Sequence, residues 1–510
     1  MHRQRRAGVL LGYANIAVKN LVNLLYTPML LAYVKQGDYG VFQTANSFVF
    51  SLSLLSFGFS GAYVRFYMQR KVRDDDAGIR LLNGMYLLLY LGICLVCVAA
   101  GLCCAAHADA IFGKSFLPDE VVLASRVMTV MTFNVALTLF STVFDAHVVA
   151  NEEFTFQQTR QMITTLATPL LALGLLQLGA GVVGVAVAQL IVTMTLLILN
   201  VIFAVGKLGM RFSFYKFDPE LMCALVVFSS WLFANQICDL VNQNVPNVLL
   251  GAQCGALVVA VYAVAVQIRN VFVSLSTTLS SVYVPLVNRI VSTTDDNMSL
   301  TRLMTRVGRM QMALLCWVYG GFALLGRFFV RRWAGEGFAE AYVLVLAMTL
   351  PLCVPLSQNI GIEIQRAKNL HQARSIVYLL MALASVVFTW AFSQKLGCWA
   401  AAISYIASIV LGNCLFMNWY YQHRVGLDMG FYWRRVAPVP VFAAIAAAMC
   451  WFGTRLIPIA NWTTFALWGF AFTVLYVTLL WIFYLDEEER RLMLVRMRSL
   501  LDRARSSVAS

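Results

Sequence analysis

Residues 9–34 form one long apolar segment near the start of the chain, VLLGYANIAVKNLVNLLYTPMLLAYV. A helix rises about 1.5 Å per residue, so roughly 20 apolar residues cross the hydrocarbon core of a membrane, and this segment predicts a transmembrane helix. Its charged residue, Lys19, lies about ten residues from the start, at roughly 15 Å of depth, which is half of that core. A cation at this depth is costly, so it must face protein, water or an anion.

Lys19 belongs to a polar stripe on this predicted helix. Asn15, Lys19 and Asn23 follow one another at intervals of four residues, and residues four apart lie on one face of a helix. The stripe therefore predicts a helix that lines a polar space inside the membrane. The cation on it indicates that this space receives something negatively charged.

The composition extends this prediction to the whole chain. Of 510 residues, 60% are hydrophobic and 12% are charged, which is typical of an all-α polytopic membrane protein and excludes a soluble globular class. Apolar runs of suitable length predict fourteen transmembrane helices. They cover residues 9–34, 41–65, 82–106, 123–148, 162–179, 182–205, 221–243, 257–283, 307–329, 342–362, 375–393, 397–420, 437–456 and 463–485.

The positive charges predict how these spans are oriented. Of 38 lysines and arginines, 28 lie on the side of the amino terminus, 8 lie on the opposite side, and Lys19 and Arg269 lie inside spans. Cytoplasmic loops of membrane proteins are enriched in these residues. An even number of spans with this distribution predicts that both termini are cytoplasmic.

A weak internal repeat predicts the domain organisation. Residues 39–53 align without gaps to residues 262–276, with five of fifteen positions identical, which pairs the second span with the eighth. An even offset keeps both halves in the same orientation, so it predicts two six-helix bundles related by a parallel pseudo-two-fold axis along the membrane normal. The bundles would cover residues 1–206 and 207–420, followed by two further spans in 421–485 and a basic amphipathic tail in 486–510.

The second buried cation, Arg269, lies near the centre of the predicted span 257–283. Its guanidinium group has two candidate anionic partners: Asp239 in the preceding span, or the anionic part of a substrate. That preceding span carries an unusual density of polar residues, which predicts either a hydrated cavity suited to a sugar or hydrogen bonds between helices. These residues are Asn235, Gln236, Asp239, Asn242 and Gln243.

Three other polar residues lie near predicted span ends. Asp145 and His147 at the end of span 123–148 form either a proton-coupling pair or an interfacial hydrogen bond. Arg65, at the end of span 41–65, taken alone is a cytoplasmic-edge arginine.

The chain contains no P-loop of the GxxxxGK[ST] type, no cluster with metal-ligand spacing and no nucleophile–histidine pair. No enzymatic activity, metal or cofactor is therefore expected, and neither is binding to nucleic acid. A membrane glycosyltransferase or polymerase needs catalytic acids or a large external loop, and a scaffolding membrane protein needs no buried cations.

Several short motifs resemble a known family. Tyr39-Gly40, the stretch Gly58-Phe59-Ser60-Gly61-Ala62-Tyr63-Val64-Arg65, Leu249-Leu250-Gly251 and Tyr262-Ala263 are similar to motifs of Wzx-type polysaccharide flippases. These flippases belong to the multidrug/oligosaccharidyl-lipid/polysaccharide exporter superfamily. The span number and the charge distribution extend the resemblance over essentially the whole chain.

The resemblance implies a transporter in the bacterial inner membrane with a cavity that opens alternately to each side. It would flip a polyprenyl-diphosphate-linked oligosaccharide from the cytoplasmic to the periplasmic leaflet, in contact with membrane lipids and with other polysaccharide assembly proteins as possible partners. Lys19 and Arg269 would receive the diphosphate, and Arg65 matches the motif arginine. A flippase for a lipid-linked peptidoglycan precursor remains an alternative. A cation-coupled multidrug exporter is disfavoured because the first span carries Lys19 and no acid.

Overall fold

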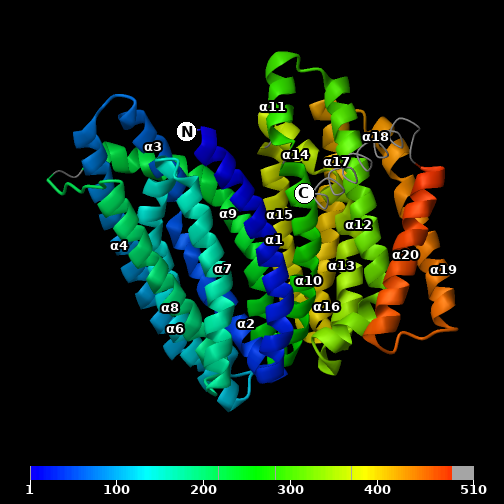
Figure 1. Ribbon diagram of the computed structural model, residues 1–510. Coiled ribbons are helices and arrows are strands. Elements are labelled where there is room, and N and C mark those ends of the chain that lie inside the picture. Colours follow the sequence, from blue (N-terminus) through cyan, green and yellow to red (C-terminus); the bar gives the residue numbers. More distant parts are fainter. Residues whose placement is uncertain (1, 216–217, 282, 369, 371, 485–510) are drawn as a thin grey trace, which may run out of the picture. The chain divides into compact units, whose positions relative to one another are not determined.

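The computed structural model describes residues 2–215, 218–281, 283–368, 370 and 372–484, without the side chains of residues 2–10, 13, 17, 231, 232, 234, 235, 238, 239 and 281. The described part is helical and contains no strand (Figure 1). The predicted tail 486–510 lies outside the described residues. The α-helices are α1 (His2–Tyr33), α2 (Gln36–Phe50), α3 (Phe59–Lys71), α4 (Asp76–Ala106), α5 (Ala108–Phe112), α6 (Pro118–Ala150), α7 (Phe154–Gln177), α8 (Gly181–Val201), α9 (Pro219–Cys254), α10 (Ala256–Ser281), α11 (Val284–Thr293), α12 (Asn297–Trp333), α13 (Ala339–Ser357), α14 (Asn359–Ala367), α15 (Gln372–Leu396), α16 (Cys398–Ser408), α17 (Met417–Tyr420), α18 (Met429–Val436), α19 (Pro438–Thr454) and α20 (Trp462–Phe483).

The all-α polytopic fold expected from the sequence is confirmed. Within the described residues, twelve helical segments are long and apolar enough to cross a membrane. The two other predicted spans, 162–179 and 221–243, lie in α7 and α9. Both helices are long enough to span; polar residues lower the hydropathy of α7, whereas several side chains of α9 lie outside the described residues. Helix α7 packs against α1 and α8, and α9 packs against α2 and α15, so each runs beside helices that can span.

The second predicted span is broken, whereas the sequence predicts one continuous segment over 41–65. Helix α2 ends at Phe50, a 3-10 turn covers Ser51–Ser56, and α3 begins at Phe59. Phe57 and Gly58 between them adopt left-handed backbone angles, with φ of 46° and 68°. Glycine adopts this conformation without a steric penalty and phenylalanine does not, so Gly58 makes the break possible.

The described residues fall into two compact units. The first contains Met1–Ser274, Trp333–Met348 and Gln372–Gly412, and the second contains Leu275–Arg332, Thr349–His371 and the chain from Asn413 onward. These are units of packing, and the predicted bundle boundaries at 206 and 420 stay a prediction.

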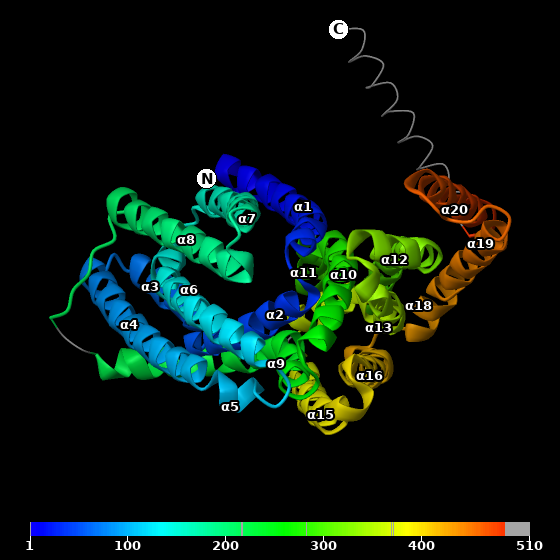
Figure 2. The same cartoon turned by 90° about the horizontal axis from the view of Figure 1, so that it is seen from below.

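In the first unit, α6 is a central helix. It packs against α4 on one side and α8 on another, while α7 bridges α8 and α1 (Figure 2). Helix α2 also packs on α6 and continues to α9. Helices α1, α7, α8 and α6 therefore follow one another as packed neighbours, since α1 packs on α7, α7 on α8 and α8 on α6.

Two glycines of the family motifs make close helix contacts in this unit. A Cβ atom added to Gly40 would overlap the carbonyl oxygen of Ala256 and lie 2.6 Å from its carbonyl carbon. One added to Gly251 would overlap the side chain of Thr44. Small residues at helix crossings in membranes let backbones approach closely. These two motif glycines thus hold α2 against α9 and the start of α10.

In the second unit, buried hydrogen bonds join α10, α12, α13 and α14. The Ser276 hydroxyl donates to the Leu356 carbonyl at 2.7 Å and accepts from the amides of Gln311 and Asn359, each at 3.1 Å. Ser276 and Gln311 are fully buried. Such interhelical hydrogen bonds typically contribute about 0.6–2 kcal/mol each in a membrane protein, so Ser276 is a structural residue of this unit.

Candidate functional site

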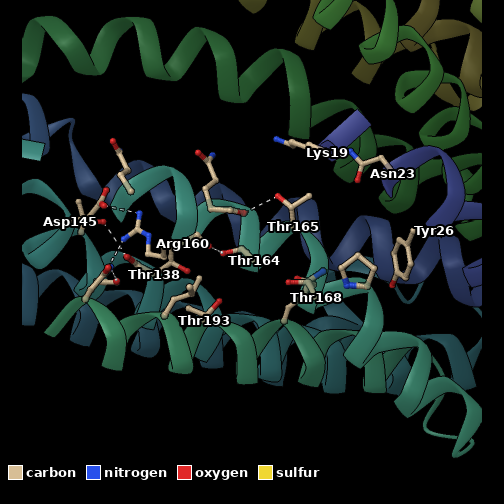
Figure 3. Close-up of a pocket in the computed structure, with 18 residues that line it drawn as sticks. Lys19, Asn23, Tyr26, Thr138, Asp145, Arg160, Thr164, Thr165, Thr168 and Thr193 are labelled. Atoms are coloured by element: carbon tan, nitrogen blue, oxygen red, sulfur yellow. Dashed lines mark hydrogen bonds and ion pairs between the residues drawn. The ribbon is translucent and has the colours of Figure 1, made fainter. Parts of the chain in front are cut away.

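A polar cavity of about 670 Å³ lies in the first unit, between α1, α6, α7 and α8. Figure 3 shows its wall, with Lys19, Asn23 and Tyr26 on one side and the threonines of α6, α7 and α8 opposite. Most of the lining side chains carry hydroxyl or amide groups. The lining residues are Lys19, Asn23, Tyr26, Thr138, Ser141, Thr142, Asp145, Gln157, Arg160, Gln161, Thr164, Thr165, Thr168, Pro169, Gln189, Thr193, Leu196 and Asn200.

Helix α7 supplies the largest polar share of this wall. Gln157, Gln161, Thr164 and Thr168 are spaced three or four residues apart and therefore share one face. This face explains why α7 is too polar to be recognised as an apolar span. The helix also packs on α1 and α8, and apolar residues such as Leu166 and Leu170 are exposed, so its polar residues gather on the cavity face.

Four of the six threonine hydroxyls in the wall donate their protons to their own helices. Thr164 and Thr165 donate to carbonyls one turn earlier, at 3.0 and 2.9 Å. Thr138 and Thr142 on α6 do the same, at 2.8 and 3.1 Å. A hydroxyl has one proton and two lone pairs. With the proton committed to the backbone, these side chains present acceptors to the cavity.

Arg160 forms the centre of a polar network at one end of the cavity. Its Nη2 lies 2.7 Å from Oδ1 of Asp145, and its Nη1 donates to Oδ1 of Asn200 at 2.6 Å. The Asn200 amide nitrogen in turn donates to the Ser141 hydroxyl at 2.8 Å. This last bond fixes the orientation of Asn200, so its oxygen faces the guanidinium group.

Lys19 and Asn23 line the cavity, as the polar stripe predicts. The Lys19 side chain is exposed to this space, and no residue that the structure describes bonds to its ammonium group. Asn15 is buried and lies one helical turn earlier, where its side chain meets Gln158 and Thr165, each at 3.4 Å. The lysine therefore offers a free positive charge inside a largely neutral polar wall.

Arg269 and Arg65 do not line this cavity. Arg269 is 4% exposed, and its guanidinium carbon lies 4.3 Å from the ring centre of Tyr405 on α16. Its Nη2 donates to Asn270 at 3.3 Å, while Nε and Nη1 have no hydrogen-bond partner among the described residues. Arg65 is exposed and stacks 4.6 Å from the ring centre of Phe228.

The polar residues of α9 are only partly described. Gln236 donates to the Ser56 hydroxyl at 3.2 Å, which places it beside the break in the second span. Asn242 is half-buried and Gln243 is exposed. The side chains of Asn235 and Asp239 lie outside the described residues, so the predicted choice of Arg269 between Asp239 and a substrate stays a prediction.

Asp145 and His147 face different surroundings, and the structure does not bring them together. Asp145 pairs with Arg160 at the cavity, whereas His147 is buried and its Nδ1 lies 2.8 Å from the Tyr63 hydroxyl. That hydroxyl donates its one proton to Asn83 at 2.6 Å. It must therefore accept from His147, which requires a proton on Nδ1.

Reasoning from the sequence did not single out Arg160 or the threonines as site residues. Arg160 was counted among the cytoplasmic cations, since it precedes the apolar part of its span. A usable signal was the spacing of Gln157, Gln161, Thr164 and Thr168 along one helix face. The partners of Arg160 come from α6 and α8, and their proximity depends on how the helices pack.

Comparisons with known proteins agree with this fold. The model of a family described as polysaccharide biosynthesis protein matches residues 33–343. An uncharacterized membrane protein of Bacillus subtilis (strain 168), EpsK, is 24% identical over 298 residues, and the match spans 57% of this chain and 58% of that protein.

Two solved structures are similar over most of their lengths. The lipid II flippase MurJ in an inward closed conformation has a TM-score of 0.73 at 13% identity, with 93% of this chain and 99% of that chain covered. An inward-facing multidrug resistance MATE family transporter of the MOP superfamily has a TM-score of 0.60 at 14% identity, with 80% and 94% covered. Both likenesses concern the fold.

Proposed function

Because the chain belongs to the polysaccharide biosynthesis protein family and has the fold of MOP-superfamily transporters, we propose that it flips a lipid-linked oligosaccharide. The substrate is a glycan joined to a polyprenyl lipid through a diphosphate, moved from the cytoplasmic to the periplasmic leaflet by alternating access. The protein is a transporter without enzymatic activity, and its product serves the assembly of a surface polysaccharide such as O-antigen or exopolysaccharide.

The observation that carries this proposal is the free cation in the polar cavity. Lys19 lies at about half of the membrane depth, and no described residue pairs with it. A diphosphate carries negative charge on each phosphate and needs cations when it leaves water. An ammonium group supplies a compact charge with three donors for such oxygens. A cationic drug would be repelled by the same residue.

The remaining lining suits the glycan. Sugar hydroxyls are donors as well as acceptors, and the threonine wall presents acceptors while Gln157, Gln161 and Gln189 present both kinds of group. The lipid tail would remain in the bilayer. A soluble substrate would need no such combination of a hydroxyl-binding wall and a mid-membrane cation.

Arg269 and Arg65 are proposed as further diphosphate contacts. Two donors of Arg269 lack a described partner in a buried position, and unsatisfied buried donors are costly. A phosphate reaching Arg269 would satisfy them. The amides of α9 are proposed as a second glycan-contacting surface.

The proposed location is the bacterial inner membrane with both termini in the cytoplasm. This follows from the excess of lysine and arginine on the side of the amino terminus. Other polysaccharide assembly proteins are proposed partners, since the flipped glycan must be received on the periplasmic side.

A strain lacking this gene provides the test, with surface glycan and lipid-linked glycan as readouts. Lys19→Ala is expected to reduce glycan export roughly tenfold or more, because one charge-assisted contact contributes about 1.5–3 kcal/mol. Lys19→Arg should retain part of the activity. Lys35→Ala, at an exposed lysine just past the same helix, is the matched control and should export normally.

The proposal fails if Lys19→Ala exports like the wild type at equal expression. The lipid intermediate that accumulates in the deletion strain separates the alternatives. A lipid-linked peptidoglycan precursor there would identify the alternative flippase, and increased sensitivity to cationic drugs without any lipid intermediate would identify a multidrug exporter.

A further inference from the structure

The cavity contains a second cation that is neutralised from within the protein. Of the ionisable side chains in its wall, Lys19 and Arg160 are positive and Asp145 is negative, so the wall carries one positive charge in excess. A diphosphate brings one negative charge for each of its two phosphates. Each phosphate can meet a cation of its own only if Asp145 no longer pairs with Arg160.

The two cations enter the same cavity from neighbouring helices. Asn15, one turn before Lys19 on α1, meets Gln158 and Thr165 on α7, so it is level with the residues just after Arg160. Lys19 and Arg160 are therefore offset along the helices by about five to six residues, or roughly 8 Å. Both side chains line the same 670 Å³ space.

The partners of Arg160 differ in what they do to its charge. Asn200 is neutral, and its side chain is oriented by Ser141 on α6, so it positions the guanidinium group without cancelling its charge. Asp145 cancels that charge. Its side chain is 28% exposed and that of Arg160 is 16% exposed, so an anion in the cavity can reach both.

Guanidinium groups bind carboxylate and phosphate oxygens with the same geometry. An incoming phosphate can therefore replace the Asp145 carboxylate at Nη2 while Asn200 still holds Nη1. The pair is only partly exposed, since both members line the polar cavity.

We propose that Asp145 is a built-in competitor of the substrate: the diphosphate displaces it from Arg160, and Arg160 then binds one phosphate while Lys19 binds the other. This rests on the proposed function, since it assumes a diphosphate substrate. While the cavity is empty, Asp145 occupies Arg160 and so weakens the binding of abundant small anions. A ligand that also binds Lys19 gains enough to displace Asp145.

Two isosteric substitutions test the idea because they change the charge around Arg160 in opposite directions. Asp145→Asn removes the competitor, and Asn200→Asp adds a second one. Binding of farnesyl diphosphate to the purified full-length protein in detergent is measured by isothermal titration calorimetry. Farnesyl phosphate serves as the ligand with a single phosphate, and folding of each variant is checked by size-exclusion chromatography.

We expect Asp145→Asn to bind farnesyl diphosphate roughly tenfold more tightly than the wild type, which is about 1.4 kcal/mol, and Asn200→Asp to bind it roughly tenfold more weakly. Farnesyl phosphate should gain less from Asp145→Asn than farnesyl diphosphate does, because a single phosphate can bind at Lys19 alone and then has no Asp145 carboxylate to displace. In a chain that carries Arg160→Gln, Asp145→Asn should no longer change the affinity for farnesyl diphosphate.

Several results overturn the inference. If both isosteric variants weaken binding alike, the network is structural and Asp145 does not compete. If Asp145→Asn leaves affinity unchanged while the wild type binds the diphosphate, the inference fails and the proposed function stands. If no form binds the diphosphate, the inference fails, and export of glycan by the wild type in the deletion strain decides separately whether the flippase function fails with it.

Discussion

The substitution Gly40→Ala tests how the second span is anchored. Glycine at this position lets α2 contact the first residue of α10, and an added Cβ would lie 2.6 Å from the carbonyl carbon of Ala256 and 3.1 Å from its Cα. Carbon atoms at van der Waals contact are about 3.5–4.0 Å apart, so the two helices would have to separate by roughly 1 Å. The neighbours Tyr39 and Val41 are 2% and 0% exposed, which leaves little room for adjustment.

The expected magnitude follows from two opposing effects. Overpacking of this kind typically destabilises by about 1–3 kcal/mol, and contact with a backbone carbonyl, which cannot rotate away, places Gly40→Ala near the upper value. Alanine favours a helix over glycine by up to about 1 kcal/mol. The net effect on the free energy of unfolding is a loss of roughly 2 kcal/mol.

Gly92→Ala is the matched control. Gly92 lies inside α4, and a Cβ atom there meets nothing within 4 Å. Only the higher helix propensity of alanine then changes the free energy of unfolding, so this variant should be as stable as the wild type or more stable. Thermal unfolding of both variants in detergent, followed by fluorescence-detected size-exclusion chromatography, makes the comparison. Equal stability of the two variants would refute the close contact between α2 and α10.

Two further substitutions test hydrogen bonds and charge. Tyr63→Phe should destabilise by about 1–3 kcal/mol, because Asn83 and the buried His147 lose their shared partner, and an unchanged unfolding temperature would contradict the bonded arrangement. Lys368→Ala breaks an ion pair with Asp295 of 2.7 Å in which the carboxylate is 58% exposed, so we expect a loss of at most about 1 kcal/mol that disappears at high salt.

The features predicted correctly from the sequence are those that depend on one helix at a time. The length and apolarity of the runs predicted a polytopic helical fold. The spacing of Asn15, Lys19 and Asn23 predicted a polar helix face, and Lys19 and Asn23 do line a cavity. Such properties follow from helical periodicity alone, and neighbouring helices do not alter them.

The features that were missed depend on contacts between helices or on backbone conformation. Arg160 is a cavity residue because Asp145 on α6 and Asn200 on α8 are brought to it, and no local pattern encodes that proximity. The break at Phe57 and Gly58 was missed because a single glycine in an apolar run is compatible with a continuous helix. The two spans 162–179 and 221–243 were predicted from their apolar runs, and they lie in helices α7 and α9.

Under the proposed function, the threonine wall has a consequence for how the transported glycan can change over evolutionary time. A hydroxyl whose proton is given to the backbone accepts from any sugar hydroxyl that reaches it. The wall therefore asks for donors at these positions and for nothing else there. A new glycosyltransferase could alter other parts of the repeating unit while the unchanged transporter continued to accept it.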